Sequence, residues 1–398
     1  MSLKKTWCLI WWIVLLLLQR PVLAASDFAH ELVRYLGIAE SSSDPDVARL
    51  TELKARAEAP GLTDEERKKA YLEMFQQIAK MQQSNPPQAA LDSMVRYAMM
   101  WYCPGDSAPL PSFTAESGAV AAVVRRGNGS IPMILIPDVG FDASVYQTFM
   151  QRNEREYAMY AVTLPGFGGT PALPPFERRD YAQLRLWKNA ETAVMNLIRK
   201  EKLKNVVLVG HQGGAYLALR MALDHPEIVK SAISLNGLLY APMSASKTLT
   251  KAERLKMVHD FFPIELFPRP GYQCLVKAWM AYPAMLSNDT ARAKQIAETA
   301  SKSDAHVVWD HYAELFATDL TDEITGVKVP VLAVAPVPDP AQSEKSLAVG
   351  QWKNLQAPMV KFRIIENSGP FVMQDNPQAL DLAIREFLKQ GEHAAATP

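Results

Sequence analysis

The chain has 398 residues, of which 48% are hydrophobic, 21% charged and 9% aromatic, a composition ordinary for a soluble globular protein. Its 42 basic and 42 acidic residues balance, and no segment concentrates Lys or Arg, which argues against a nucleic-acid partner. The length suffices for one large α/β domain with additional segments.

The first 24 residues have the pattern of a secretory signal peptide. Lys4 and Lys5 precede an apolar run from Cys8 to Leu18, and Val22-Leu23-Ala24 offers a cleavage point. The alternative is an uncleaved anchor, but a spanning helix needs about 20 apolar residues and this run is shorter. We therefore expect export to the periplasm or beyond, and a mature form that does not span the membrane.

Two cysteines, Cys103 and Cys274, remain after cleavage. In an oxidising compartment they can pair, or they can pack as separate buried thiols, and the sequence leaves both alternatives open. No Cys/His spacing resembles a zinc site, so we expect no metal ligands and no cofactor.

Residues 25–112 are expected to form a helical region. Thr63-Asp64-Glu65-Glu66 is a capping box that opens a helix, and a second apolar helix is expected through Leu91, Val95, Met99 and Trp101. The first helix carries an apolar stripe, which we expect to pack on the main domain; a ligand surface is the alternative. The stripe consists of Ala70, Tyr71, Met74, Phe75, Ile78 and Met81.

From residue 113 onward, short apolar runs alternate with amphipathic segments such as 180–200 and 215–224, which is typical of a mostly parallel sheet covered by helices. The predicted α/β core spans 113–239 and 326–390, with a helical cap at 240–325 and a disordered tail at 391–398. The predicted strands are 119–124, 133–136, 160–164, 206–209, 232–235, 331–334 and 362–365.

Several segments, taken in order, resemble the α/β-hydrolase superfamily over residues 113–390. Residues 163–170 (TLPGFGGT) are similar to the loop after the family's fourth strand, and residues 206–214 (VVLVGHQGG) to its nucleophile elbow. Residues 224–229 are similar to the end of the next helix, residues 329–339 to the strand that leads to the catalytic acid, and residues 367–377 to the histidine loop. The resemblance implies an α/β-hydrolase fold.

The catalytic positions that this resemblance assigns carry unusual residues. Gln212 stands at the nucleophile position and Pro370 at the histidine position, while Asp339 stands at the acid position. Pro137-Asp138 replaces the family's His-Gly in the oxyanion loop. Loss of the serine or the histidine alone costs about 10⁶ in kcat, so ordinary triad chemistry is not expected.

Other groups near the expected cleft are candidate substitutes for the missing catalytic residues. Asp138, Val139, His211 and Gly213 adjoin the elbow, and the predicted cap contains His259, His306 and His311. The resemblance implies no catalytic role for His211, since members of the family often carry His at this position. We expect the cap histidines to pack or to face solvent, and Asp138 to be solvated or to cap its loop. A catalytic role for any of these groups is the alternative.

Three interpretations follow. The first is an exported pseudo-hydrolase that binds a small apolar molecule or a protein partner, and a Gln212→Ser/Pro370→His variant tests whether it is a disarmed hydrolase. The second is an active hydrolase of ester-like substrates, in which Gln212 is a hydrogen-bond donor and Asp138 or a cap histidine is the base. The third is an interaction protein with a collapsed cleft.

Overall fold

The computed structural model describes residues 45–57, 59, 61–81, 88, 112–174, 180–240, 250–261 and 286–395. The chain divides into two compact units: the described residues up to 88 belong to one, and those from 112 onward to the other. The predicted signal peptide, the helix predicted around 91–101, Cys103 and Cys274 lie outside the described residues. Within the described part of the chain, no helix is long and apolar enough to cross a membrane.

The first unit contains helices α3 (Pro45–Ala57) and α4 (Asp64–Met81), which contact each other. The predicted capping box is confirmed, because the Glu66 amide donates to Thr63 Oγ1 (3.3 Å) and the Thr63 amide donates to Glu66 Oε2 (2.9 Å). The predicted apolar stripe is buried at its five described side chains, which are Ala70, Tyr71, Met74, Phe75 and Ile78.

The second unit is built on a seven-stranded sheet in the order β1-β3-β2-β4-β5-β6-β7. Only β1 is antiparallel to its neighbour; the other pairs are parallel. All seven predicted strands are confirmed. Their bounds are β1 (Ala122–Arg126), β2 (Ile131–Ile136), β3 (Tyr157–Thr163), β4 (Val206–His211), β5 (Val229–Leu235), β6 (Val331–Val337) and β7 (Val360–Glu366).

The first strand begins three residues later than predicted. Gly118 has a positive φ of 72° in a turn, and the ladder with β3 starts only at Ala122, which pairs with Thr163. The strands β4 and β6 are buried along their whole length, because a parallel strand in the middle of a sheet is covered on both faces.

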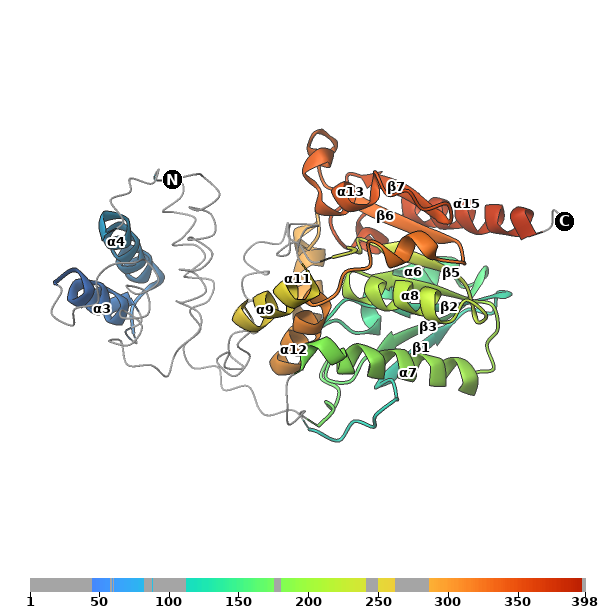
Figure 1. The fold of residues 1–398 in the computed structure, drawn as a ribbon, viewed down its shortest axis with the longest axis horizontal. Helices are drawn as coiled ribbons and strands as arrows, with labels where there is room; N and C mark the ends of the chain where they lie inside the picture. Colours follow the sequence, from blue (N-terminus) through green and yellow to red (C-terminus); the bar gives the residue numbers. More distant parts are fainter. Residues whose placement is uncertain are drawn as a thin grey trace. The chain divides into compact units, whose positions relative to one another are not determined.

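Helices α7 (Arg185–Lys200) and α8 (Gly213–Asp224) lie side by side in front of the sheet (Figure 1). The helix predicted at 180–200 is divided. A short 3₁₀ turn, η2 (Tyr181–Gln183), ends at Leu184, whose φ of 51° interrupts the helical backbone before α7 begins.

A second group of helices joins residues distant in sequence. It comprises α6 (Gln147–Asn153), α14 (Val372–Asp375) and α15 (Pro377–Ala395). Asp381 of α15 accepts hydrogen bonds from Arg152 Nε (2.9 Å) and Asn153 Nδ2 (3.1 Å) of α6. Another helix of the core, α13 (Leu347–Trp352), lies between β6 and β7 in the chain.

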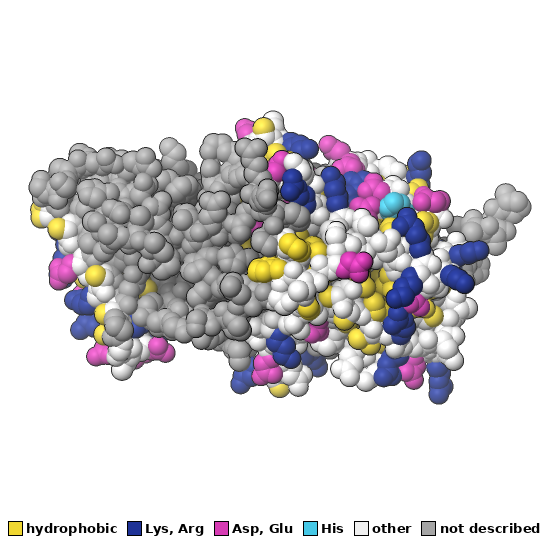
Figure 2. Space-filling view, turned by 90° about the horizontal axis from the view of Figure 1, so that it is seen from below, with side chains coloured by type: hydrophobic (Ala, Val, Ile, Leu, Met, Phe, Trp, Pro, Cys, Tyr) yellow, Lys and Arg dark blue, Asp and Glu magenta, His cyan; other side chains and the backbone are white. Residues whose placement is uncertain are grey.

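The described part of the interval between β5 and β6 is mainly helical, as predicted. It contains α9 (Lys251–Phe261), α11 (Thr290–Ala300) and α12 (Ala305–Phe316), and a single bridge joins Tyr240 to Asp319. On the face shown in Figure 2, Lys and Arg side chains are interspersed with Asp and Glu, in keeping with the balanced composition.

Candidate functional site

The strained turn that the sequence predicts after β4 is present. Gln212 has φ 46° and ψ −108°, a backbone conformation that residues other than glycine rarely adopt. The turn needs small neighbours, because a Cβ on Gly210 would lie 2.1 Å from the Gly214 carbonyl oxygen and one on Gly214 would lie 2.3 Å from that of Ile136. The elbow, defined here as residues 210–214, therefore presents Gln212 at its tip.

His211, beside the elbow tip, is fully buried and is used in packing. Its Nε2 lies 3.0 Å from the carbonyl oxygen of Pro370, and its ring lies 4.5 Å from that of Phe371. Burial lowers the pKa of His211 to about 4, although the bond to Pro370 opposes the shift. The imidazole is therefore neutral at pH 7, and its Nε2–H donates to the Pro370 carbonyl.

The half-buried Gln212 side chain adds little to this arrangement. Its Nε2 lies 3.4 Å from His211 Nε2, but no hydrogen bond joins them, because His211 Nε2 is the donor to the Pro370 carbonyl and the amide nitrogen is also a donor. An amide nitrogen that shares its lone pair with a carbonyl is neither a useful nucleophile nor a base.

The structure brings Pro370 to the elbow through the loop after β7. This loop is held by Asp375, which accepts the Gly369 amide at 2.8 Å and a hydrogen bond from Ser287 of the segment before α11. Pro370 has no titratable group, so only its carbonyl takes part in the site.

Asp339, the predicted acid position, lies after β6 and is exposed. Its Oδ1 accepts the Ala341 amide at 3.0 Å and caps the 3₁₀ turn η7 (Pro340–Lys345). The carboxylate at the predicted acid position therefore caps a turn.

Asp138 has the most informative position of the predicted residues. It follows β2, it is only 3% exposed, and its Oδ1 accepts two backbone N–H groups: that of Val139 at 2.7 Å and that of Gly213 at 2.8 Å. Burial raises the pKa of Asp138 to about 7, against the opposing effect of these two bonds. The structure thus joins three of the predicted cleft residues around one oxygen atom.

The cap histidine with a described side chain, His311 of α12, is also a packing residue. Its Nδ1 lies 2.8 Å from the Val307 carbonyl oxygen, and its ring lies 4.9 Å from Phe167 and 5.2 Å from Trp187. Burial lowers the pKa of His311 to about 4. The side chains of His259 and His306 lie outside the described residues.

Glu314, also on α12, was missed from the sequence. Its carboxylate accepts the Leu186 amide at 3.0 Å and the Trp187 amide at 3.2 Å, and so caps the N-terminus of α7. Burial raises the pKa of Glu314 to about 7. An acidic residue in the apolar run of residues 311–316 was the available signal.

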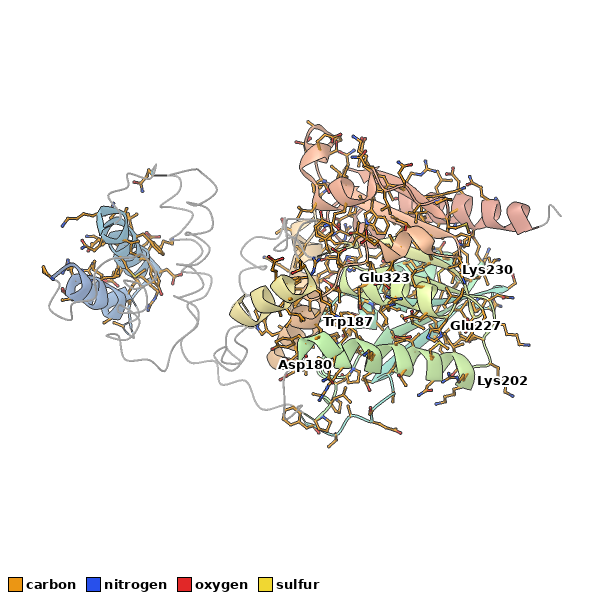
Figure 3. The ribbon with its side chains drawn as sticks, viewed as in Figure 1. Asp180, Trp187, Lys202, Glu227, Lys230 and Glu323 are labelled. Atoms are coloured by element: carbon orange, nitrogen blue, oxygen red, sulfur yellow. The ribbon has the colours of Figure 1, made fainter. Side chains whose placement is uncertain are left out.

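A cavity of about 390 Å³ lies away from the elbow, and it too was missed. Trp187 and Glu323, labelled in Figure 3, both line it. Arg254, which is 5% exposed, pairs with Asp319 at 2.9 Å in the wall. Charged and apolar side chains from α7, α8 and α9 are mixed in the lining. Among the residues that the structure describes, no cluster of His, Cys, Asp or Glu could hold a metal ion.

Comparison with known proteins identifies the family. The model of the alpha/beta hydrolase family matches residues 133–381, more than half of the chain, and the chain therefore belongs to this family. Epoxide hydrolase 3 of Xenopus tropicalis is 26% identical over 293 residues, which are 69% of this chain and 76% of that protein. An (E)-2-((N-methylformamido)methylene)succinate hydrolase of Acinetobacter baylyi is 26% identical over 145 residues, 36% of this chain and 52% of that protein.

Solved structures agree on the fold. An esterase from Exiguobacterium antarcticum superposes with a TM-score of 0.53 at 16% identity, covering 70% of this chain and 100% of that one. In this family the oxyanion hole is formed by the N–H of the residue after the nucleophile and an N–H from the loop before the first core helix. Gly213 and Val139 hold those two positions here, and both of their N–H groups are bonded to Asp138.

Proposed function

We propose that the chain is a non-hydrolytic member of the alpha/beta hydrolase family, exported from the cytoplasm, that binds a small molecule or a protein partner without turning it over. The observation that carries the proposal is the elbow itself. Its strained backbone is present, yet Gln212 stands at its tip and the imidazole of the adjacent His211 is bonded to the Pro370 carbonyl.

The elbow lacks the groups that acyl transfer requires. Acyl transfer needs an oxygen or sulfur nucleophile, a base that takes its proton and returns it, and a carboxylate that orients the base. Gln212 and Pro370 supply neither of the first two functions, and Asp339 caps its own turn. Loss of one such group costs about 10⁶ in kcat, which is about 8 kcal/mol of transition-state stabilisation.

A binding role is supported by a cavity in the second unit. Its volume of about 390 Å³ falls within the range of small-molecule sites, about 300–1,000 Å³. Its mixed lining suits a ligand with both polar and apolar groups better than the purely apolar ligand expected from the sequence. Export rests on residues 1–24, and the N-terminal sequence of the mature protein isolated from cell fractions tests it.

Turnover of an ester, lactone, amide and epoxide panel by the purified mature protein tests the central claim. We expect rates at the level of the uncatalysed reaction, and the same rates for Gln212→Ala as the matched control. Turnover above the uncatalysed rate would overturn the proposal, whether or not it depends on Gln212.

A second candidate function is favoured by one observation. A carboxyl group whose pKa is about 7 is well tuned for general-base catalysis at neutral pH, and Asp138 lies beside the elbow. Hydrolysis by a water that Asp138 activates would show a rate that rises with pH around 7. Asp138→Asn would abolish that rise, whereas a flat profile at the background rate excludes this candidate.

A further inference from the structure

One oxygen atom accepts both N–H groups of the oxyanion hole. Asp138 Oδ1 lies 2.7 Å from the Val139 nitrogen and 2.8 Å from the Gly213 nitrogen, at the short end of the range for N–H···O hydrogen bonds. A developing oxyanion would take the same two donors at the same distances. The two N–H groups therefore form a site for one carboxyl or carbonyl oxygen, and this site is filled from within the chain.

We propose that the oxyanion hole is preserved as a carboxylate-binding site and that Asp138 is its built-in occupant, so that it accepts a small external carboxylate only when this side chain is removed. The inference rests on the proposed function for the view that this part of the molecule binds rather than reacts.

The space around the occupying oxygen is closely packed. A Cβ placed on Gly213 would lie 2.7 Å from Val139 Cγ2 and 3.0 Å from Asp138 Oδ1. Val139 is 1% exposed and Gly213 is buried. A ligand oxygen cannot share the hole with Oδ1, and the chain itself therefore blocks acyl or carboxylate binding at this point.

The loop that carries the Val139 N–H is held independently of the Asp138 side chain. The Phe141 amide donates to the Asp138 carbonyl at 3.1 Å, Ser303 Oγ donates to the Gly140 carbonyl at 2.6 Å, and the Ala143 amide donates to Thr163 Oγ1 at 3.1 Å. Because none of these bonds involves the carboxyl group, truncation of Asp138 should leave both N–H groups in place and unpaired.

The occupied donors also restrict which ligands can bind at the elbow of the wild-type protein. At the elbow, both oxyanion N–H groups are already bonded to Asp138, and this carboxyl group is ionised at alkaline pH. An anionic group of the ligand would be repelled by that charge. The elbow therefore selects against carboxylic acids and other anions.

The experiment measures acetate binding to the purified mature chain and to two variants. Asp138→Gly, which installs the residue found at this position in the family, opens the hole. Asp138→Asn is the matched control, since its amide oxygen can still accept both N–H groups. Titrations with ¹³C-labelled acetate at constant ionic strength, followed by NMR, give the dissociation constants.

We expect Asp138→Gly to bind acetate at least about tenfold more tightly than the wild type or Asp138→Asn, the factor that one charge-assisted hydrogen bond supplies. The amide resonances of Val139 and Gly213 should shift on binding. Equal affinity in all three proteins, or binding to Asp138→Gly that leaves these two resonances unmoved, would overturn the inference.

A measurement on the wild type keeps the test decisive if Asp138→Gly does not fold. The amide protons of Val139 and Gly213 should titrate together as Asp138 ionises, whereas amides that do not follow this ionisation would contradict the internal occupant. Because acetate is not turned over, these results are independent of the ester assay that tests the proposed function.

Discussion

Restoring ester hydrolysis at the elbow should require three substitutions, not two. The sequence by itself suggests that Gln212→Ser with Pro370→His restores the nucleophile and the base. In the structure, however, Asp138 occupies both oxyanion donors, so a tetrahedral intermediate formed at Ser in position 212 would have no stabilising N–H group. The triple variant with Asp138→Gly returns those donors to the substrate.

The magnitude follows from the number of donors. Removal of one oxyanion-hole donor costs about 10²–10³ in kcat, roughly 2.7–4 kcal/mol. Because both donors are blocked here by one carboxylate, the triple variant should exceed the double variant by at least about 10²-fold. The double variant should remain near the uncatalysed rate, since the hole and the active groups act as a unit.

Hydrolysis of short-chain 4-nitrophenyl esters measures the effect, with kcat and KM determined separately. The matched control combines Gln212→Ser and Pro370→His with Asp138→Asn, whose amide oxygen keeps the donors occupied; it should behave as the double variant does. Circular dichroism establishes that each variant is folded. If the double and triple variants were equally active, the hole would not be blocked and the reasoning would be refuted.

Three further predictions concern stability. Burial raises the pKa of Asp138 from 3.8 to about 7, so the ionisation of this carboxyl group opposes folding. As the pH rises from 4 to 8, the free energy of unfolding of the wild type should therefore fall by at most about 4 kcal/mol relative to that of Asp138→Asn. Urea denaturation at both pH values measures this difference, and a difference that does not change with pH would contradict the prediction. Burial lowers the pKa of His311 from 6.5 to about 4, so about 3 kcal/mol of stability is fully present above pH 6.5 and is lost as the pH falls to 4. In His311→Gln, the free energy of unfolding should fall less over this pH range in the same assay. An equal fall in the wild type and the variant would count against burial of His311 as the cause. Glu314→Ala should lower the free energy of unfolding by about 1–3 kcal/mol, because it leaves two buried amides of α7 unpaired. A lower midpoint of thermal unfolding measures this loss. In Glu314→Gln, the side-chain carbonyl can still accept these amides and should recover part of the stability.

Local patterns in the sequence determined the framework of this protein. The apolar runs gave seven strands that the structure confirms, because a buried parallel strand is a continuous apolar segment. Gly210, Gly213 and Gly214 indicated the elbow, because only small residues fit where strand and helix cross so closely. The sequence also shows Gln212 and Pro370 at the catalytic positions. From these two residues, the loss of triad chemistry is expected.

Only the tertiary structure decided what the remaining polar groups do. Asp138 and Gly213 are 75 residues apart, and Glu314 lies 128 residues from the amide of Leu186 that it accepts. No local pattern connects such pairs. The sequence shows that a carboxylate is present; whether it ends as a base, a cap or an occupant of the oxyanion hole depends on which N–H groups the fold brings within hydrogen-bonding distance, since a buried charge is stabilised by the donors around it and not by its neighbours in the chain.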